Sequence, residues 1–300
     1  MKKIVLIIGN GFDLDLGLKT SYMDFADSEF WPKGILIEKE NIYRKQGLLA
    51  FLDKYKSDNW FDLESLLKKF ADSNYSYVEM TYNRSSRVEE NKQLFYGIIQ
   101  NLSFYLNKQQ ECASLNHPSL ASQFISKCNY FNKIYTFNYT DINYLAERLG
   151  YGTSCNVIHL HGSIKENNII LGVDESDVLI DSYRFLQKSF NSNYKSHHLL
   201  ADLDKANEVI FFGFSFSTID LGYFNNWLSN CKRKTIKIIT KDRESLEAIK
   251  ANLQNKGLKI SGLYGQSFVE HFYTDDQPCF DDIIRAKWHE KILFRLRSLF

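Results

Sequence analysis

Short apolar runs bounded by polar turns open the chain and return after residue 126. They span 3–8, 133–137, 156–160, 168–173, 208–214 and 235–240. Continuous apolar runs of this length are typical of strands buried on both faces of a sheet. A helical pattern over 194–206 precedes the run at 208–214, and another over 243–254 follows the run at 235–240. The alternation predicts an α/β protein with a mostly parallel, Rossmann-like sheet covered by helices on both faces.

The segment between residues 28 and 126 has a different, helical pattern. Leu94, Ile98, Leu102 and Tyr105 are spaced as one face of a helix, and no strand pattern interrupts the segment. We therefore predict a helical insertion over 28–126, with 1–27 and 127–300 forming the core. Apolar residues also recur at helical spacing over 281–300, which predicts a packed terminal helix.

The composition is that of a globular protein, with 44% hydrophobic residues and 37 basic against 36 acidic side chains. This balance gives no general attraction for nucleic acid. No apolar run approaches the roughly 20 residues needed to span a bilayer, and no cleavable leader opens the chain, so we expect a cytoplasmic protein without membrane contact. The five cysteines include no close pair, which argues against a zinc site and predicts reduced thiols instead of a disulfide framework.

Four polar turns follow predicted strands, at the edge where open α/β sheets place their ligands. They are Gly9–Asp13, Thr136–Asp141, His159–Ser163 and Gly213–Ser217. In the first turn, Gly9 and Gly11 permit close approach of a backbone to a ligand. Leu14 occupies the place of the third glycine of the dinucleotide fingerprint, so a standard dehydrogenase site is excluded. A plain structural turn and a phosphate site both remain open.

Two histidines lie two residues apart, so their side chains point to the same face of a strand. We interpret His161, which precedes Gly162 at the strand end, as the chemical residue, and His159 as a hydrogen-bonded support. The alternative is that both are structural. A zinc site is weakly supported because no third ligand lies nearby.

Three further polar residues leave two interpretations open. Asn138 and Asp141 either cap the following helix or orient a ribose. Glu64 lies on the apolar helical face formed by Leu63 and Leu67, where a carboxylate needs donors, a cation or solvent. It therefore either lines a cleft or pairs with an Arg or Lys elsewhere in the chain.

Taken together, the four turns resemble the sirtuin-like superfamily in their order along the chain. More narrowly, the residues Ile7–Asp13, Leu16-Gly17-Leu18, Thr20-Ser21-Tyr22 and Asp24-Phe25, joined to Trp60 and Glu64, resemble the bacteriophage abortive-infection AbiH family. The likeness covers nearly the whole chain. A four-cysteine zinc module, which deacetylase sirtuins carry, is missing from the sequence.

This resemblance implies a phage-defence protein that binds NAD or a related nucleotide in a sirtuin-like core and hydrolyses its nicotinamide-ribosyl bond. NAD is then substrate or ligand, and neither a metal nor a further cofactor is required. The implied catalytic residues are Asn138, His161, Asp141 and Glu64. The implied nucleotide-binding residues are Gly9, Asn10, Gly11, Phe12, Asp13, Gly213, Ser215 and Asp220.

Two other roles fit the same resemblance: a nucleotide sensor without turnover, and an interaction subunit that assembles with itself or with another defence or toxin-antitoxin protein. A nuclease fits less well, because no paired carboxylates have two-metal spacing. If Asn138 and His161 lie at a cleft surface, replacing either by alanine should abolish activity and leave the melting temperature nearly unchanged. Gly11→Val should weaken nucleotide affinity more than stability.

Overall fold

The computed structural model describes residues 2–32, 47–56, 62–78, 84–174, 181–194, 198–217, 220–255, 257 and 268–284. Six parallel strands form one sheet in the order β3-β2-β1-β4-β5-β6. The strands are β1 (Ile4–Ile8), β2 (Lys133–Thr136), β3 (Val157–His159), β4 (Glu208–Phe212), β5 (Thr235–Thr240) and β6 (Phe268–Tyr273). This order is that of a doubly wound Rossmann-like sheet, which confirms the predicted fold class.

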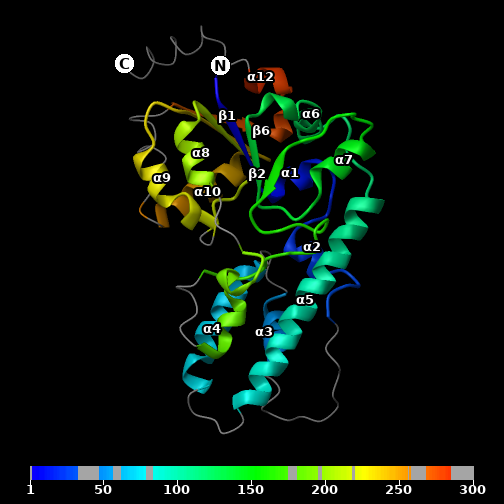
Figure 1. Ribbon diagram of the computed structural model, residues 1–300, viewed down its shortest axis with the longest axis vertical. Helices are drawn as coiled ribbons and strands as arrows, with labels where there is room; N and C mark the ends of the chain where they lie inside the picture. The colour runs from blue at the N-terminus through cyan, green and yellow to red at the C-terminus, as the bar shows by residue number, and fades with distance from the viewer. Residues whose placement is uncertain are drawn as a thin grey trace.

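Helices cover both faces of the sheet, because alternate residues of each central strand point in opposite directions. On one face, Val5 and Ile7 of β1 pack with α8 (Leu199–Lys205), α9 (Asn225–Asn230) and α10 (Arg243–Asn255). On the other face, Leu6 and Ile8 pack with a second set of helices (Figure 1). These are α1 (Asn10–Asp15), α6 (Leu120–Ser126), α7 (Ile142–Arg148) and α12 (Phe280–Ile284). The rest of the predicted terminal helix, 285–300, lies outside the described residues.

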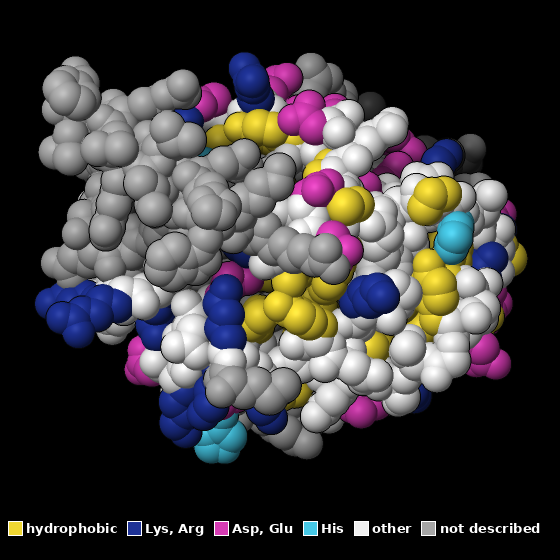
Figure 2. All heavy atoms as spheres, turned by 90° about the horizontal axis from the view of Figure 1, so that it is seen from above, with side chains coloured by type: hydrophobic (Ala, Val, Ile, Leu, Met, Phe, Trp, Pro, Cys, Tyr) yellow, Lys and Arg dark blue, Asp and Glu magenta, His cyan; other side chains and the backbone are white. Residues whose placement is uncertain are grey.

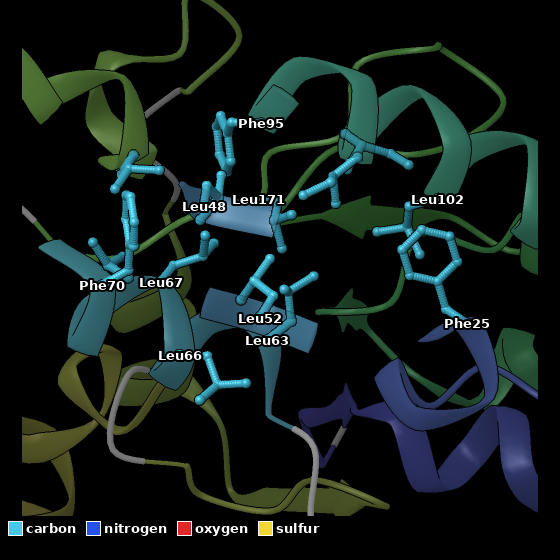
Figure 3. Close-up of a cluster of buried hydrophobic side chains, with 14 of the residues drawn as sticks. Phe25, Leu48, Leu52, Leu63, Leu66, Leu67, Phe70, Phe95, Leu102 and Leu171 are labelled. Atoms are coloured by element: carbon cyan, nitrogen blue, oxygen red, sulfur yellow. The ribbon is translucent and has the colours of Figure 1, made fainter. Parts of the chain in front are cut away.

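The helical region forms a separate layer below the sheet in Figure 1. It contains α3 (Leu48–Tyr55), α4 (Leu63–Val78) and the long α5 (Arg84–Cys112), and α2 (Tyr22–Ala26) lies between it and the sheet. Figure 3 shows its core, in which leucines of α3 and α4 face Phe95 and Leu102 of α5. The strands run toward this layer, so the carboxyl edge of the sheet faces the helical region.

One predicted strand does not join the sheet, and one strand was not predicted. The apolar run at 168–173 does not join the sheet: only Val173 makes an isolated bridge, to Gln187. Its residue Leu171 packs instead in the core of the helical region, beside Tyr183 of the short helix η4 (Asp181–Leu186). An apolar run signals burial equally well in either place. The edge strand β6 was missed, because Glu270 and His271 interrupt its apolar pattern.

The prediction that all cysteines are reduced thiols is also wrong. Cys128, in the short helix η2 (Cys128–Tyr130), forms a disulfide with Cys155, which precedes β3. Their Cα atoms are 5.5 Å apart although 27 residues separate them in the sequence. The spacing gave no signal because the approach depends on β2 and α7 folding back between them.

Candidate functional site

The start of α1, directly after β1, contacts the turn after β4 at the carboxyl edge. The Gly9 N–H donates to the Phe212 carbonyl at 3.0 Å, and the Gly11 N–H donates to the Gly213 carbonyl at 2.9 Å. A Cβ atom on Gly11 would lie 2.6 Å from the Gly213 Cα, and Gly213 has a φ of +63°. Glycine is needed here because the two backbones touch. The Gly11 N–H is therefore already used within the protein.

This contact changes the expectation for Gly11. Even Gly11→Ala should lower the free energy of unfolding by about 1–3 kcal/mol, because the Gly213 backbone must move away from the new methyl group. Gly97→Ala is the matched control, since a Cβ atom at Gly97 of α5 meets nothing within 4 Å. The control should gain stability. Urea unfolding of both variants decides the point, and equal stability of Gly11→Ala and the parent would contradict it.

Asp13 and Asn138 join α1, which directly follows β1, to the turn after β2. The buried Asp13 carboxylate accepts hydrogen bonds from Asn138 Nδ2 and Thr140 Oγ1, both at 2.8 Å. Asn138 Nδ2 also donates to the Gly9 carbonyl at 3.1 Å. Burial raises the pKa of Asp13 to about 6, although these two side-chain hydrogen bonds act to lower it. Both amide hydrogens of Asn138 are thus used in holding the turns together.

A pH dependence follows from Asp13. Because its folded-state pKa of about 6 lies above the ordinary 3.8, the native state binds this proton more tightly than the unfolded chain does. The contribution of Asp13 to stability should therefore fall as pH rises from about 4 to about 6, by about 3 kcal/mol in total. Asp13→Asn keeps an acceptor for Asn138 and should remove this slope. Urea midpoints across that pH range test it, and identical slopes in variant and parent would show that Asp13 is not the group.

A cluster of four ionisable side chains, three of them buried and one partly exposed, lies where the helical region meets the sheet. We call it the Lys188 cluster: Glu64 of α4, His161 after β3, Lys188 of η5 (Lys188–Phe190) and Asp220 of η6 (Asp220–Tyr223). Lys188 Nζ lies 3.1 Å from the Glu64 carboxylate, 3.4 Å from His161 Nε2 and 3.5 Å from Asp220 Oδ1. His161 Nε2 is 3.9 Å from Asp220 Oδ1. Four segments distant in the sequence thus meet at one ammonium group.

The charges in the Lys188 cluster are strongly interdependent. Burial raises the pKa of Glu64 to about 8; Lys188 opposes this rise and Asp220 adds to it. Burial acts to lower the pKa of Lys188, but the carboxylates of Glu64 and Asp220 hold it above its ordinary value. Lys188 therefore stays an ammonium ion, while the carboxyl group of Glu64 can hold a proton near neutral pH.

Pairing with a cation, one of the two alternatives open for Glu64, is what the structure contains. Its carboxylate pairs with a lysine, and that lysine contacts His161. The sequence did not identify Lys188, because one lysine in the aromatic stretch 183–190 reads as an exposed charge. Trp60, the other residue of this region that carries the family resemblance, lies outside the described residues.

The two histidines have different surroundings. The His161 ring packs edge-on against Phe137, with ring centroids 5.1 Å apart, and only 3% of the residue is exposed. His159 is half-buried, and its Nδ1 lies 3.0 Å from the Asn138 carbonyl, as expected of a supporting residue. Asn138 is buried as well. The premise that Asn138 and His161 lie at a surface is therefore wrong, and it was the reason for expecting an unchanged melting temperature in their alanine variants.

Asp141 is the N-cap residue of α7, the helix that follows it. Its side chain caps α7 by accepting from the Asn143 N–H at 3.0 Å, and Lys165 forms an ion pair with it at 3.2 Å. Capping, one of the two alternatives open for this residue, is what the structure contains.

The remaining predicted binding residues differ in exposure. The Phe12 ring is buried and packs edge-on against Phe212, with centroids 5.0 Å apart. Asn10 is exposed, and its Oδ1 accepts from Thr20 Oγ1 at 2.6 Å. Ser215 is exposed as well. Of the predicted nucleotide-binding residues, Asp220 is the one that reaches the Lys188 cluster.

Among the described residues, neither the surface charge nor the distribution of possible metal ligands indicates a further site. Basic and acidic side chains are interspersed over the face seen in Figure 2. In the part of the chain that the structure describes, no group of three or more His, Cys, Asp or Glu residues could hold a metal ion. Within the same residues, no helix is long and apolar enough to cross a membrane.

Comparison with known proteins bears on the family. A search of curated proteins gave no match. The sequence pattern of the bacteriophage abortive infection AbiH family matches residues 5–242, a span that includes the Lys188 cluster and the turns after β1, β2, β3 and β4. The match covers well over half of the 300 residues. The chain therefore belongs to the bacteriophage abortive infection AbiH family, whose role is defence against phage.

Proposed function

We propose that this AbiH-family protein binds NAD at the carboxyl edge of its sheet and hydrolyses the bond between nicotinamide and ribose. The observation that carries the proposal is the Lys188 cluster, a largely buried set of acids and bases at that edge. In open α/β sheets, ligands bind outside the carboxyl ends of the strands where the strand order reverses. Here the reversal falls between β1 and β4, beside the turns of Asp13 and Gly213.

Cleavage of the bond between nicotinamide and ribose needs little acid catalysis. As the C1′–N1 bond breaks, both electrons pass to the pyridinium nitrogen, so nicotinamide leaves as a neutral molecule. The ribosyl carbon becomes cationic and accepts the oxygen of a water molecule. His161 takes the proton released by that water, and the products are ADP-ribose, nicotinamide and a proton. Asp220 supplies negative charge that favours the cationic ribosyl group, and Glu64 adds to it at pH values above its raised pKa of about 8.

Binding is assigned to the neighbouring turns. The amide hydrogens of Asn138 are used by Gly9 and Asp13, which leaves its Oδ1 to accept from a ribose hydroxyl. The Gly11 N–H is also used. Within the first turn, the phosphate contact is therefore assigned to the exposed Asn10.

Incubating the purified full-length protein with NAD, and measuring free nicotinamide and ADP-ribose by chromatography, tests this function. Release of both products at equal rates supports it. Calorimetry on the same sample measures binding. A protein that neither binds NAD nor releases nicotinamide would overturn the proposal.

Binding without product would favour a nucleotide sensor. One observation supports that alternative: Lys188 connects His161 at the sheet directly to Glu64 of the helical region. A ligand that disturbs the Lys188 cluster would therefore act on the position of α4 without any bond being broken.

A further inference from the structure

We propose that Lys188 is a positioning residue that holds His161 neutral, with an unprotonated Nε2, and so prepares it as a base. The inference rests on the function proposed above, which it deepens. Nothing in the sequence pattern assigned a role to Lys188, and the geometry of its three contacts carries the argument.

Lys188 can only donate in its hydrogen bonds, so its partners must accept. An ammonium group has three hydrogens and no acceptor. Lys188 Nζ faces three acceptors, at 3.1 Å for Glu64, 3.4 Å for His161 Nε2 and 3.5 Å for Asp220. A contact between this ammonium and His161 Nε2 is favourable only when Nε2 carries a lone pair, because a protonated Nε2 would place two donors against each other. The imidazole proton therefore belongs on Nδ1.

Every charged or titratable group around His161 bears on its protonation. Lys188 disfavours an imidazolium, whereas Asp220 favours one, and Glu64 acts from the far side of Lys188. Tyr223 and Tyr139 also face this region, and burial raises the pKa of both, so they stay neutral. If Lys188 were removed, Asp220 would act unopposed. The pKa of His161 would then rise, so the imidazole would be protonated, and unable to act as a base, up to a higher pH.

A double variant, Lys188→Met with Glu64→Gln, removes the cation together with the more deeply buried of its two carboxylate partners, so that only the partly exposed Asp220 loses its counter-ion. Glu64→Gln alone is the matched control, because it loses the same carboxylate and keeps Lys188. We expect the His161 pKa to rise by at least about one unit in the double variant relative to the control. The two proteins differ only at residue 188, so a difference in the His161 pKa between them reports the effect of the Lys188 ammonium group.

The measurement is NMR of protein carrying isotope-labelled histidine, with the His161 signal assigned from the spectrum of His161→Gln. In the parent at neutral pH, the Nε2 nitrogen should have the chemical shift of an unprotonated nitrogen. Equal titration of His161 in the double variant and the control would overturn the proposal. A protonated Nε2 in the parent would also overturn it, so the parent spectrum decides even if the double variant does not fold.

A second readout separates this inference from the proposed function. If the parent releases nicotinamide, the acid limb of the rate against pH should move upward in the double variant by the same amount as the His161 titration. If the parent releases none, the proposed hydrolysis fails while the NMR titration still decides the role of Lys188. A titration that shifts while the acid limb stays in place would contradict His161 as the base.

Discussion

Replacing Lys188 with methionine is expected to lower the free energy of unfolding by about 3–5 kcal/mol at about pH 9. Methionine fills a similar volume but leaves Glu64, which is 6% exposed, and Asp220 without their cation. The loss should be smaller at about pH 6, because a protonated Glu64 needs no counter-ion. The sign follows from the raised pKa of Glu64: a carboxyl group of this kind destabilises the fold as pH rises and the group is forced to ionise.

Urea unfolding at the two pH values measures this effect. Lys108→Met is a matched control, because Lys108 also forms an ion pair, with Glu29, but at the surface. It should unfold like the parent. Combining Lys188→Met with Glu64→Gln should restore part of the lost stability, since the buried carboxylate is then absent. A single Lys188→Met variant as stable as the parent at the higher pH would mean that the buried ion pair does not form.

Replacing His161 with glutamine is expected to slow nicotinamide release at least about 100-fold. Glutamine offers an oxygen that can accept from Lys188, so the contact is kept while the basic imidazole is lost. Alanine is a poorer test, because it would leave a cavity against Phe137 and remove the acceptor for Lys188.

His271→Gln is the control for this substitution. His271 lies on β6, at the edge of the sheet far from β3, so the variant should release nicotinamide at the parent rate. Circular dichroism and urea unfolding establish that both variants are folded. A folded His161→Gln protein with the parent rate would remove His161 from the chemistry and leave the base to be sought among the carboxyl groups.

The sequence by itself determined the features that depend on local pattern. Continuous apolar runs located β1, β2, β4 and β5, because a strand buried on both faces has no polar face to conceal the signal. The glycine turn and the residues that follow it as far as Phe25 carried the family resemblance, which the match over 5–242 confirms. The turn residues at the carboxyl edge could be named because polar residues directly after buried strands are visible in one dimension.

Only the tertiary structure decided which of those residues meet. Lys188 and Glu64 are 124 positions apart, and nothing local distinguishes a lysine that will be buried by such a partner from one that stays in water. The same holds for Cys128 and Cys155, and for the apolar run at 168–173, which found its burial against the helical region instead of in the sheet. The sequence pattern specifies which residues are buried, but the fold specifies the partner that makes a buried charge tolerable. Desolvation and Coulomb attraction depend on distances, and these distances exist only once the helical region has docked on the sheet.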